Sequence, residues 1–558
     1  MWKYRILYCS ILLLAVAASC KKGGENPAPP PPVTKSFSFN SLKVNGSFSG
    51  YTYYNINAKP QLQFSFNDAL DHASVNNSFS IKDISGNTLV YEVSYGNGDS
   101  TVTIVPGSPL NPITQYTVAV SANLVSKQSS RLQSGISVRL ITAIDSTAKF
   151  PLLSDSALLD LVQKQTFRYF WDFAHPVSGL ARERNSSGNL VTTGGSGFGI
   201  MAIVVAVNRQ FITRAEGLAR MQKIVDFLKN KADRFHGAFP HWLNGTTGEV
   251  IPFGARDDGA DLVETSFLME GLLTARQYFN GIDANETALK EDINALWNAV
   301  EWSWFRKNNE NVLYWHWSPN YNWDMNFAIR GWNEALVTYV LAASSATYSV
   351  PKPVYDNGWA SNGAIMNNNS FFGYNLPLGP NNGGPLFFAH YSFLGIDPLG
   401  LTDSYANYWD QNRNHSLINY SYCKSNPKNY YGYSSLCWGL TASDDNINGY
   451  LAHAPDNDDG VIAPTAALSS FPYTPTESMD ALRFFYYTLG DKIWKDYGFV
   501  DAFSLKDVWF SDSYLAIDEG PIIGMIENYR SGLLWNLFTS CPEIKTGMNN
   551  LGFQSPHL

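Results

Sequence analysis

Residues 213–232 read TRAEGLARMQKIVDFLKNKA, and this stretch carries its own start signal for a helix. Thr213 and Glu216 have the spacing of a capping box, in which the two side chains satisfy the first free backbone N–H groups. Beyond this stretch, further helices are predicted near 261–280, 284–307, 331–349, 402–420, 475–489 and 520–540. Loops rich in Gly, Asn and Pro separate them, notably 351–384. Residues 150–558 are therefore predicted to form an all-α domain.

The length of this helical region favours one architecture. Twelve helices over residues 150–558 would give each helix and its loop roughly 34 residues. That arithmetic fits an (α/α)6 toroid, in which six helical hairpins form a double ring and long loops line a cleft at one end. No repeat of fixed period is visible, which argues against a regular solenoid.

Residues 38–145 follow the pattern of strands instead. Leu62, Phe64 and Phe66 alternate with polar residues, as expected of strands with one buried face, and Asn97-Gly98 favours a hairpin turn. FSFNDALDHASV (64–75) and TVTIVPGSPLNPITQYTVAVS (101–121) resemble bacterial Ig-like domains that precede secreted enzymes. We therefore expect a small all-β Ig-like sandwich that serves as a spacer or docking module and adds no catalytic group.

The N-terminus has the composition of a targeting segment. Basic Lys3 and Arg5 precede a short apolar run, which ends in small residues before Cys20. This pattern predicts a lipoprotein signal peptide over 1–19, lipidation of Cys20 and a Pro-rich linker over 20–37, and hence a periplasmic or outer-membrane-associated lipoprotein of a Gram-negative bacterium. A plain secretory signal is the alternative. Nothing later in the chain is long and apolar enough to be a transmembrane helix.

Composition narrows the class of ligand. The 558 residues carry a formal net charge of −9, and no basic block is present to neutralise phosphates, so nucleic-acid binding is disfavoured. Aromatic residues make up 14%, with 16 Trp and 31 Tyr. Trp and Tyr in such number suit the flat faces of sugar rings. We expect a polysaccharide or oligosaccharide substrate and a monomeric protein that contacts a membrane only through its lipid anchor.

The clearest acidic cluster is GARDDGADLVETSF (254–267). On a continuous helix, Asp257, Asp261 and Glu264 would lie within about 60° of one another. Such a stripe suits carboxylates in a cleft, where neighbours raise at least one pKa. The structural alternative is that Asp257 or Asp258 caps the helix and the other carboxylates favour its positive end.

Two further acids stand at predicted helix starts. Glu334 opens an apolar helix after the aromatic run YWHWSPNYNW (314–323), whose rings could stack on sugars. Asp518 ends an apolar run before Gly520-Pro521, which is expected to open a helix, while Glu519 is expected to be solvated. For both acids a plain role at the helix terminus is the alternative.

Other motifs give little support for metal, phosphate or disulfide chemistry. The run 456–460 resembles a calcium loop, but its glycine is one place early and the twelfth position is Ala467. Gly194 to Gly197 lacks the preceding strand and the lysine of a phosphate loop, and no HExxH pattern occurs. Cys423 and Cys437 could pair. We expect neither a metal nor a cofactor.

Several long motifs resemble the glycoamylase-like family, whose characterised members form glycoside hydrolase family 144. They include VTTGGSGFGIMAIVVAVNRQFITRAEGLARM, FGARDDGADLVETSFLMEGLLTARQYF, YWHWSP, GPLFFAHYSFLG and YLAIDEGPIIGMIENYRSGLLW, and the likeness covers roughly 150–555. The resemblance implies an (α/α)6 toroid and cleavage of β-1,2-glucan, internally or from an end with release of sophorose. The positions that match the family's cleft carboxylates are Asp257, Asp261, Glu264, Glu334 and Asp518.

Glycosidic cleavage needs an acid for the leaving oxygen and a second carboxylate for water or the anomeric carbon. The interpretation is an inverting hydrolase with Glu334 as acid and Asp518 as base, although the 257–264 cluster could supply the acid instead. The candidate sugar-binding residues are Trp315, His316, Trp317, Trp323 and His390. Alternatives are an α-glucan glucoamylase, a non-catalytic lipid-anchored glycan-binding protein, and a lyase, which the acidic charge balance disfavours.

Overall fold

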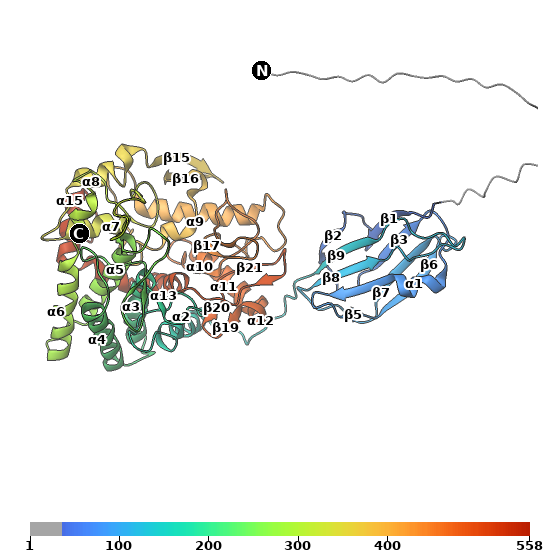
Figure 1. Ribbon diagram of the computed structural model, residues 1–558, viewed down its shortest axis with the longest axis horizontal. Coiled ribbons are helices and arrows are strands. Elements are labelled where there is room, and N and C mark those ends of the chain that lie inside the picture. The colour runs from blue at the N-terminus through green and yellow to red at the C-terminus, as the bar shows by residue number, and fades with distance from the viewer. Residues whose placement is uncertain (1–35) are drawn as a thin grey trace, which may run out of the picture.

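The computed structural model describes residues 36–558, so the predicted signal peptide, Cys20 and almost all of the predicted linker lie outside the described residues. Figure 1 shows two bodies: a strand-rich domain at the N-terminal side and a larger, mostly helical domain joined to it by an extended segment. Within residues 36–558, no helix combines the length and the hydropathy needed to cross a membrane.

The first body is the expected two-layer sandwich. One sheet has the order β1-β3-β7-β6 and the other the order β2-β9-β8-β4-β5. Leu62, Phe64 and Phe66 are buried between the sheets, which confirms the alternating pattern. Asn97 and Gly98 both have positive φ in the β6–β7 turn, as predicted. The elements are β1 Phe39–Val44, β2 Thr52–Ile56, β3 Leu62–Phe66, α1 His72–Ser78, β4 Phe79–Asp83, β5 Thr88–Leu89, β6 Tyr91–Gly96, β7 Thr101–Pro106, β8 Gln115–Val120 and β9 Ile136–Thr142.

The second body is built from helices with short strand pairs in its loops. The capping box is present: Thr213 accepts from the backbone of Glu216, and the Glu216 carboxylate accepts from Thr213. The helices are α2 Asp155–Trp171, α3 Thr193–Asn208, α4 Arg214–Asn230, α5 Leu262–Tyr278, α6 Ala284–Ala299, α7 Leu336–Ser344, α8 Lys352–Asn357, α9 Tyr408–Ser425, α10 Pro464–Leu468, α11 Pro475–Arg483, α12 Gly490–Ile493, α13 Ala516–Ser531, α14 Leu533–Thr539 and α15 Pro542–Leu551.

Helix α3 packs against both α5 and α13, which are drawn beside it in Figure 1. Every residue from Thr193 to Val207 is buried. Glycines allow the close approach: a Cβ on Gly197 would lie 2.1 Å from the carbonyl oxygen of Phe267 on α5, and one on Gly271 would lie 2.2 Å from the carbonyl oxygen of Gly197. Two backbones in contact bring the first turns of α3 and α5 close together.

The predicted helix at 331–349 is shorter in the structure, since α7 begins at Leu336, and the one at 402–420 is shifted to 408–425. The helix predicted over 284–307 ends at Ala299 and is followed by a 3-10 turn over Trp302–Arg306. The one predicted at 520–540 is two helices, α13 and α14, which are separated by the left-handed Gly532. Pro521 therefore lies inside α13 instead of opening it.

The predicted loop 351–384 contains α8 and a hairpin of β15 (Met366–Phe371) and β16 (Tyr374–Leu378). A short strand, β10 (Leu190–Thr192), does precede the Gly194–Gly197 run, contrary to expectation, but that run is the first turn of α3. Cys423, Cys437 and Cys541 are all buried free thiols, so Cys423 and Cys437 do not pair here.

The two bodies touch through a few specific contacts. The guanidinium of Arg139 on β9 donates to the backbone carbonyl of Lys506 at 3.2 Å. The rings of Tyr54 and Tyr431 stack with centroids 5.6 Å apart, and the Tyr431 hydroxyl donates to the carbonyl of Thr142. The sandwich therefore contacts the helical domain at loop residues, namely Tyr431 and Lys506.

Candidate active site

The first turns of α3, α5 and α13, together with the turn before α7, surround a cavity of about 410 Å³, here called the central cavity. Helix N-termini carry partial positive charge, so this is a favourable place for carboxylates. Two of the five predicted acids, Glu264 and Glu334, are on its wall. The lining residues are Glu183, Arg184, Thr192, His241, Trp242, Phe253, Glu264, Phe267, Trp315, Glu334, Phe387, Tyr391, Ala442, Tyr450, Leu515 and Ile517.

A second hollow of about 610 Å³, here called the adjoining hollow, shares His241, Phe253 and Trp315 with the central cavity. Asp257 and His316 are among its lining residues. The shared residues place the two hollows next to each other, and together they are here called the cleft. A cleft of this extent, lined by aromatic rings and carboxylates, suits an oligosaccharide better than a single sugar.

The cluster at 257–264 is assembled differently from the predicted helical stripe. Helix α5 begins at Leu262, and its cap is Asp261, whose Oδ1 accepts from the N–H groups of Val263 and Glu264. Asp257 lies in the preceding turn and not on the helix, so neither Asp257 nor Asp258 is the cap. The three acids still converge, because the chain folds back before the helix starts.

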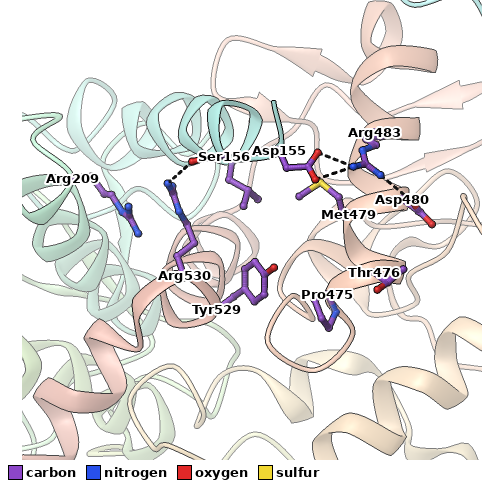
Figure 2. Close-up of a pocket in the computed structure, with 11 residues that line it drawn as sticks. Asp155, Ser156, Arg209, Pro475, Thr476, Met479, Asp480, Arg483, Tyr529 and Arg530 are labelled. Atoms are coloured by element: carbon purple, nitrogen blue, oxygen red, sulfur yellow. Dashed lines mark hydrogen bonds and ion pairs between the residues drawn. The ribbon is translucent and has the colours of Figure 1, made fainter. Parts of the chain in front are cut away.

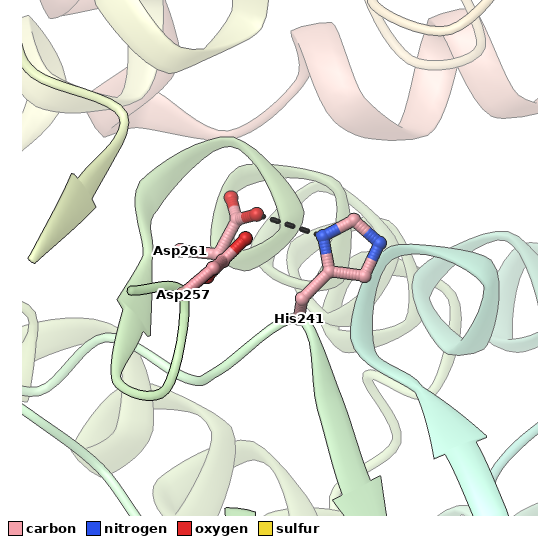
Figure 3. A group of neighbouring side chains, drawn as sticks. All are labelled: His241, Asp257 and Asp261. Carbon is pink, nitrogen blue, oxygen red and sulfur yellow. Dashed lines mark hydrogen bonds and ion pairs between the residues drawn. The ribbon is translucent and has the colours of Figure 1, made fainter. Parts of the chain in front are cut away.

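Two histidines contact the carboxylates of this cluster, and Figure 3 shows the contact from His241. His241 Nδ1 donates to Asp261 Oδ2 at 2.9 Å, and His316 Nε2 lies 3.4 Å from Asp257 Oδ2 and 3.5 Å from Asp261 Oδ2. β13 (Ala260–Asp261) pairs with β14 (His316–Trp317), which places His316 directly opposite Asp261. Sequence reasoning missed His241, because it is more than fifteen residues from the acids and belongs to no motif.

Charges within the cluster shift its proton affinities in opposite directions. Burial would lower the pKa of His241, but the carboxylates of Glu264, Asp261 and Asp257 raise it to about 9, so it is an imidazolium at neutral pH. Burial opposes ionisation of Asp261, yet hydrogen bonds from His241 and His316 hold its pKa below the usual value. Burial and the charge of Asp261 raise the pKa of Asp257 to about 6.

Asp261 is fully buried and lines neither hollow, and both of its carboxylate oxygens are engaged in hydrogen bonds. Asp257 Oδ1 and His316 Nδ1, in contrast, are buried without a hydrogen-bond partner within the described residues. Such atoms are costly unless a ligand or water satisfies them. They mark the adjoining hollow as a place where sugar hydroxyls would bind.

Glu264 faces the central cavity from the first turn of α5. Its Oε2 accepts from the backbone N–H of Gly194 at 2.7 Å and from the Thr192 hydroxyl at 3.4 Å. Burial raises its pKa, while the charge of His241 works in the opposite direction. A Cβ on Gly194 would lie 2.7 Å from this oxygen, so the glycine makes room for the carboxylate.

Glu334 stands in the turn two residues before α7, not inside the helix as predicted. Its backbone carbonyl accepts from the Ser392 hydroxyl, which fixes the turn. Burial, assisted by the negative charges of Glu264 and Asp261, raises the pKa of Glu334 to about 7. A carboxylic acid that keeps its proton at neutral pH can act as a general acid.

Asp518 lies in the first turn of α13, next to the lining residue Ile517, and is not itself among the residues that line the central cavity. Burial and the nearby carboxyl of Asp501 raise its pKa well above the usual range, and burial also raises that of Glu519. Glu519 is only 1% exposed, so the expectation that it is solvated was wrong. Neither acid caps α13, whose N-cap is Leu515.

The predicted aromatic residues divide into two groups. Trp315 lines both hollows, and His316 lines the adjoining one. Trp317 and Trp323 instead pack on Trp304 of the domain core, with ring centroids 5.3 and 4.8 Å away.

His390 is buried against the Ser470 hydroxyl at 3.0 Å and lines neither hollow. The structure therefore brings Trp315 and His316 to the cleft, but not Trp317, Trp323 or His390. Further rings on the central cavity wall, which the sequence patterns did not single out, belong to Trp242, Phe253, Phe387, Tyr391 and Tyr450.

A third cavity, of about 830 Å³, lies at the other end of α13, beside Tyr529 and Arg530 (Figure 2). Its arginines already have partners: Arg209 pairs with Glu527, Arg483 with Asp155, and Arg530 with Asp160. With its guanidinium groups neutralised, this cavity has no free charge for an anionic ligand. It shares no lining residue with the cleft.

His241, Asp257 and Asp261 also have the composition of a metal site, with ligand atoms within 4.8 Å of one another. Both oxygens of Asp261 are already used, one by the helix cap and one by His241. A cation there would have to break those hydrogen bonds.

A helical domain with buried carboxylates and aromatic rings around one cleft defines a protein of the carbohydrate-active class, and comparisons with known proteins agree. Residues 326–542 match the Glycoamylase family model, described as "Putative glucoamylase", and residues 41–139 match the bacterial Ig-like domain.

An endo-β-1,2-glucanase from Chitinophaga pinensis is 55% identical, with a TM-score of 0.71, over 73% of this chain and 100% of that one. A β-1,2-glucanase from Parabacteroides distasonis is 38% identical, with a TM-score of 0.70, over 93% of this chain and 74% of that one. The exo β-1,2-glucooligosaccharide sophorohydrolase (non-reducing end) of Parabacteroides distasonis is 47% identical over 428 residues, 73% of this chain.

The match spans 59% of the length of that sophorohydrolase. The chain belongs to the glycoamylase-like family, of glycoside hydrolase family 144 type, and carries an N-terminal Ig-like domain.

Proposed function

We propose that this protein is a glycoside hydrolase that cleaves β-1,2-glucan. The observation that carries the proposal is that Glu264 and Glu334, two carboxyl groups with raised pKa values, lie on the wall of one aromatic-lined cavity. The β-1,2 linkage is assigned from the similarity to relatives that act on β-1,2-glucan. An α-glucan glucoamylase and a non-catalytic glycan-binding protein are the competing functions.

Glu334 is the proposed general acid. It protonates the glycosidic oxygen of the leaving sugar, and its pKa of about 7 keeps it protonated at the start of the reaction. As the bond between the anomeric carbon and that oxygen breaks, water attacks the anomeric carbon and gives its proton to the second carboxylate. That carboxyl group then releases its proton to solvent, and Glu334 takes one up from solvent before the next turnover.

For the base, the position of the side chains favours Glu264 over Asp518. A base must reach the attacking water directly, and Glu264 is among the residues that line the central cavity whereas Asp518 is not. The imidazolium of His241 and the N–H of Gly194 favour the ionised form of Glu264. In this proposal Asp518, whose carboxyl group lies near that of Asp501, is not the base. It acts by influencing the electrostatic potential in the cavity.

We further propose that the helical domain is an (α/α)6 toroid with inversion at the anomeric carbon. Support comes from the successive packing of α13, α3, α5 and α7 and from their N-termini, which all lie at the cavity end. Inversion would require roughly 6.5–9.5 Å between acid and base, to leave room for water.

The protein is also proposed to be a monomeric lipoprotein, anchored through Cys20 in the periplasm or at the outer membrane. The apolar run that ends in small residues before Cys20 supports this. Incorporation of radiolabelled palmitate by the wild type and not by Cys20→Ala would test the anchor.

The function itself is tested by incubating the purified protein with β-1,2-glucan and separating the products by size. Sophorose as the first product indicates attack from an end, and a ladder of oligosaccharides indicates internal cleavage; either result supports the proposal. No products from β-1,2-glucan, together with retained binding to it, would point to the non-catalytic alternative.

A further inference from the structure

The hairpin of β17 (Ala442–Asp445) and β18 (Gly449–Ala452) and the loop that follows it bring together three potential metal ligands: Asp445, His453 and Asp459. One ligand atom from each lies within 4.8 Å of the other two. His453 Nε2 is 3.5 Å from Asp445 Oδ2, and His453 Nδ1 is 3.3 Å from Asp459 Oδ1. None of the three lines the cleft.

Two of these side chains, Asp445 and His453, are deeply buried, while that of Asp459 is partly exposed. The Asp445 side chain is 0% exposed and that of His453 is 1% exposed. Asp445 Oδ2, both ring nitrogens of His453 and Asp459 Oδ1 all lack a hydrogen-bond partner within the described residues. Asp445 Oδ2 faces one ring nitrogen of His453 and Asp459 Oδ1 faces the other, but neither contact is a hydrogen bond. Buried polar atoms without a hydrogen bond are costly unless a ligand binds them.

The surrounding loop orients the carboxylates toward this point. Asp445 Oδ1 accepts from the N–H of Ile447 at 2.7 Å, and Asp459 Oδ2 accepts from the amide of Asn448 at 3.1 Å. Each carboxylate thus uses one oxygen for the loop and leaves the other directed at His453. Such supporting hydrogen bonds are typical of the shell that positions metal ligands.

We infer that Asp445, His453 and Asp459 bind a divalent transition-metal ion, with Zn²⁺ as the best match. One imidazole nitrogen and two carboxylate oxygens form a three-ligand set of the kind that zinc accepts, and water completes the coordination. Ca²⁺ fits less well, because it takes six to eight oxygen ligands. The neighbouring carboxylate of Asp458 is not available, since it accepts from the hydroxyls of Tyr422 and Tyr433.

The site would link the hairpin to the loop at 453–459. Asp445 ends β17, next to Asp444, which pairs across the hairpin with the cavity residue Tyr450. Asp444 also binds Arg184 of the cavity wall at 3.1 Å. A bound ion would therefore hold in place the hairpin that forms one side of the central cavity, without taking part in hydrolysis.

The test is a calorimetric titration of chelator-treated, full-length protein with Zn²⁺, followed by metal analysis of the dialysed complex. We expect one Zn²⁺ per chain. Asp459→Asn removes a ligand from a partly exposed position and should weaken binding by at least the roughly 10–100-fold that loss of an outer-shell partner costs. Asp456→Asn changes an exposed carboxylate in the same loop and should bind like the wild type.

Absence of Zn²⁺ binding by the wild type, equal binding by wild type and Asp459→Asn, or tighter binding of Ca²⁺ than of Zn²⁺ would overturn the inference. If Asp459→Asn does not fold, hydrogen exchange of the wild type decides. Zn²⁺-dependent protection of residues 442–459 supports the site, whereas protection confined to the His241 and Asp257 region contradicts it. None of these readouts depends on glucan hydrolysis, so failure of the proposed function would not affect them.

Discussion

At the residue scale, Glu334 is the group on which the proposed chemistry depends most. It combines a place on the cavity wall with a pKa of about 7, raised first by burial. Glu334→Gln keeps the size of the side chain and removes the proton donor. We expect kcat on β-1,2-glucan to fall by about 10²–10⁴-fold, the usual contribution of general acid catalysis, with an unchanged melting temperature.

The matched control for this change is Glu291→Gln on the exposed face of α6, which should leave kcat unaltered. Steady-state rates and circular dichroism of the two variants check the prediction. A Glu334→Gln enzyme with near-wild-type kcat would show that another group supplies the proton.

The pH dependence follows from the same side chain. The acid works only while protonated, so its contribution to activity should be present well below pH 7 and should be lost as pH rises through the pKa of about 7. The descending limb of kcat/KM against pH, measured on soluble oligosaccharides, should have its midpoint near that value.

An aryl sophoroside with a good leaving group needs no such proton. With this substrate, Glu334→Gln should keep much of its rate and lose the descending limb. A limb of the same midpoint in the variant would assign the titration to a different group.

At the scale of elements, the crossing of α3 and α5 sets the position of the site. Gly197→Ala would place a methyl group 2.1 Å from the Phe267 carbonyl, and neither backbone can move without shifting the other helix. We expect a loss of at least about 1–3 kcal/mol in the free energy of unfolding, the usual cost of overpacking.

The control for this change is Gly96→Ala in the sandwich, where a Cβ has nothing within 4 Å. Thermal unfolding of both variants, followed by circular dichroism, measures the effect. If Gly197→Ala and Gly96→Ala had the same melting temperature, α3 and α5 would be able to move apart at little cost despite their backbone contact.

The elements differ in how far their positions could be predicted from the sequence. The α4 start was predictable because the capping box is a local signal, and the sandwich strands were predictable because alternation is local too. Helix α3 was not singled out, since TGGSGFG has low helix propensity and its glycines serve a tertiary contact.

Among site residues, Glu264 and Glu334 could be chosen from sequence because they accompany motifs at helix starts. His241 and Asp501 could not, because only the folded chain brings them to Asp261 and Asp518.

At the scale of the whole molecule, the sandwich touches the helical domain but contributes no residue to the cleft. The Chitinophaga relative matches 73% of this chain over its full length, which is about the share of the helical domain. Deletion of residues 21–145 should therefore leave kcat on soluble oligosaccharides within a few-fold. A collapse of kcat in a deleted chain that still folds would mean that the sandwich shapes the cleft.

The central claim, hydrolysis of the β-1,2 linkage, is tested most directly by the ratio of initial rates on β-1,2-glucan and on starch at equal sugar concentration. Discrimination by several buried hydroxyl contacts can reach about 10⁴-fold, because a wrong linkage leaves polar groups unpaired. Asp257 Oδ1 and His316 Nδ1 are two such groups in the cleft. We predict that β-1,2-glucan is cleaved at least about a hundredfold faster than starch. Comparable rates, or release of glucose from starch with no action on β-1,2-glucan, would contradict the claim and favour an α-glucan glucoamylase.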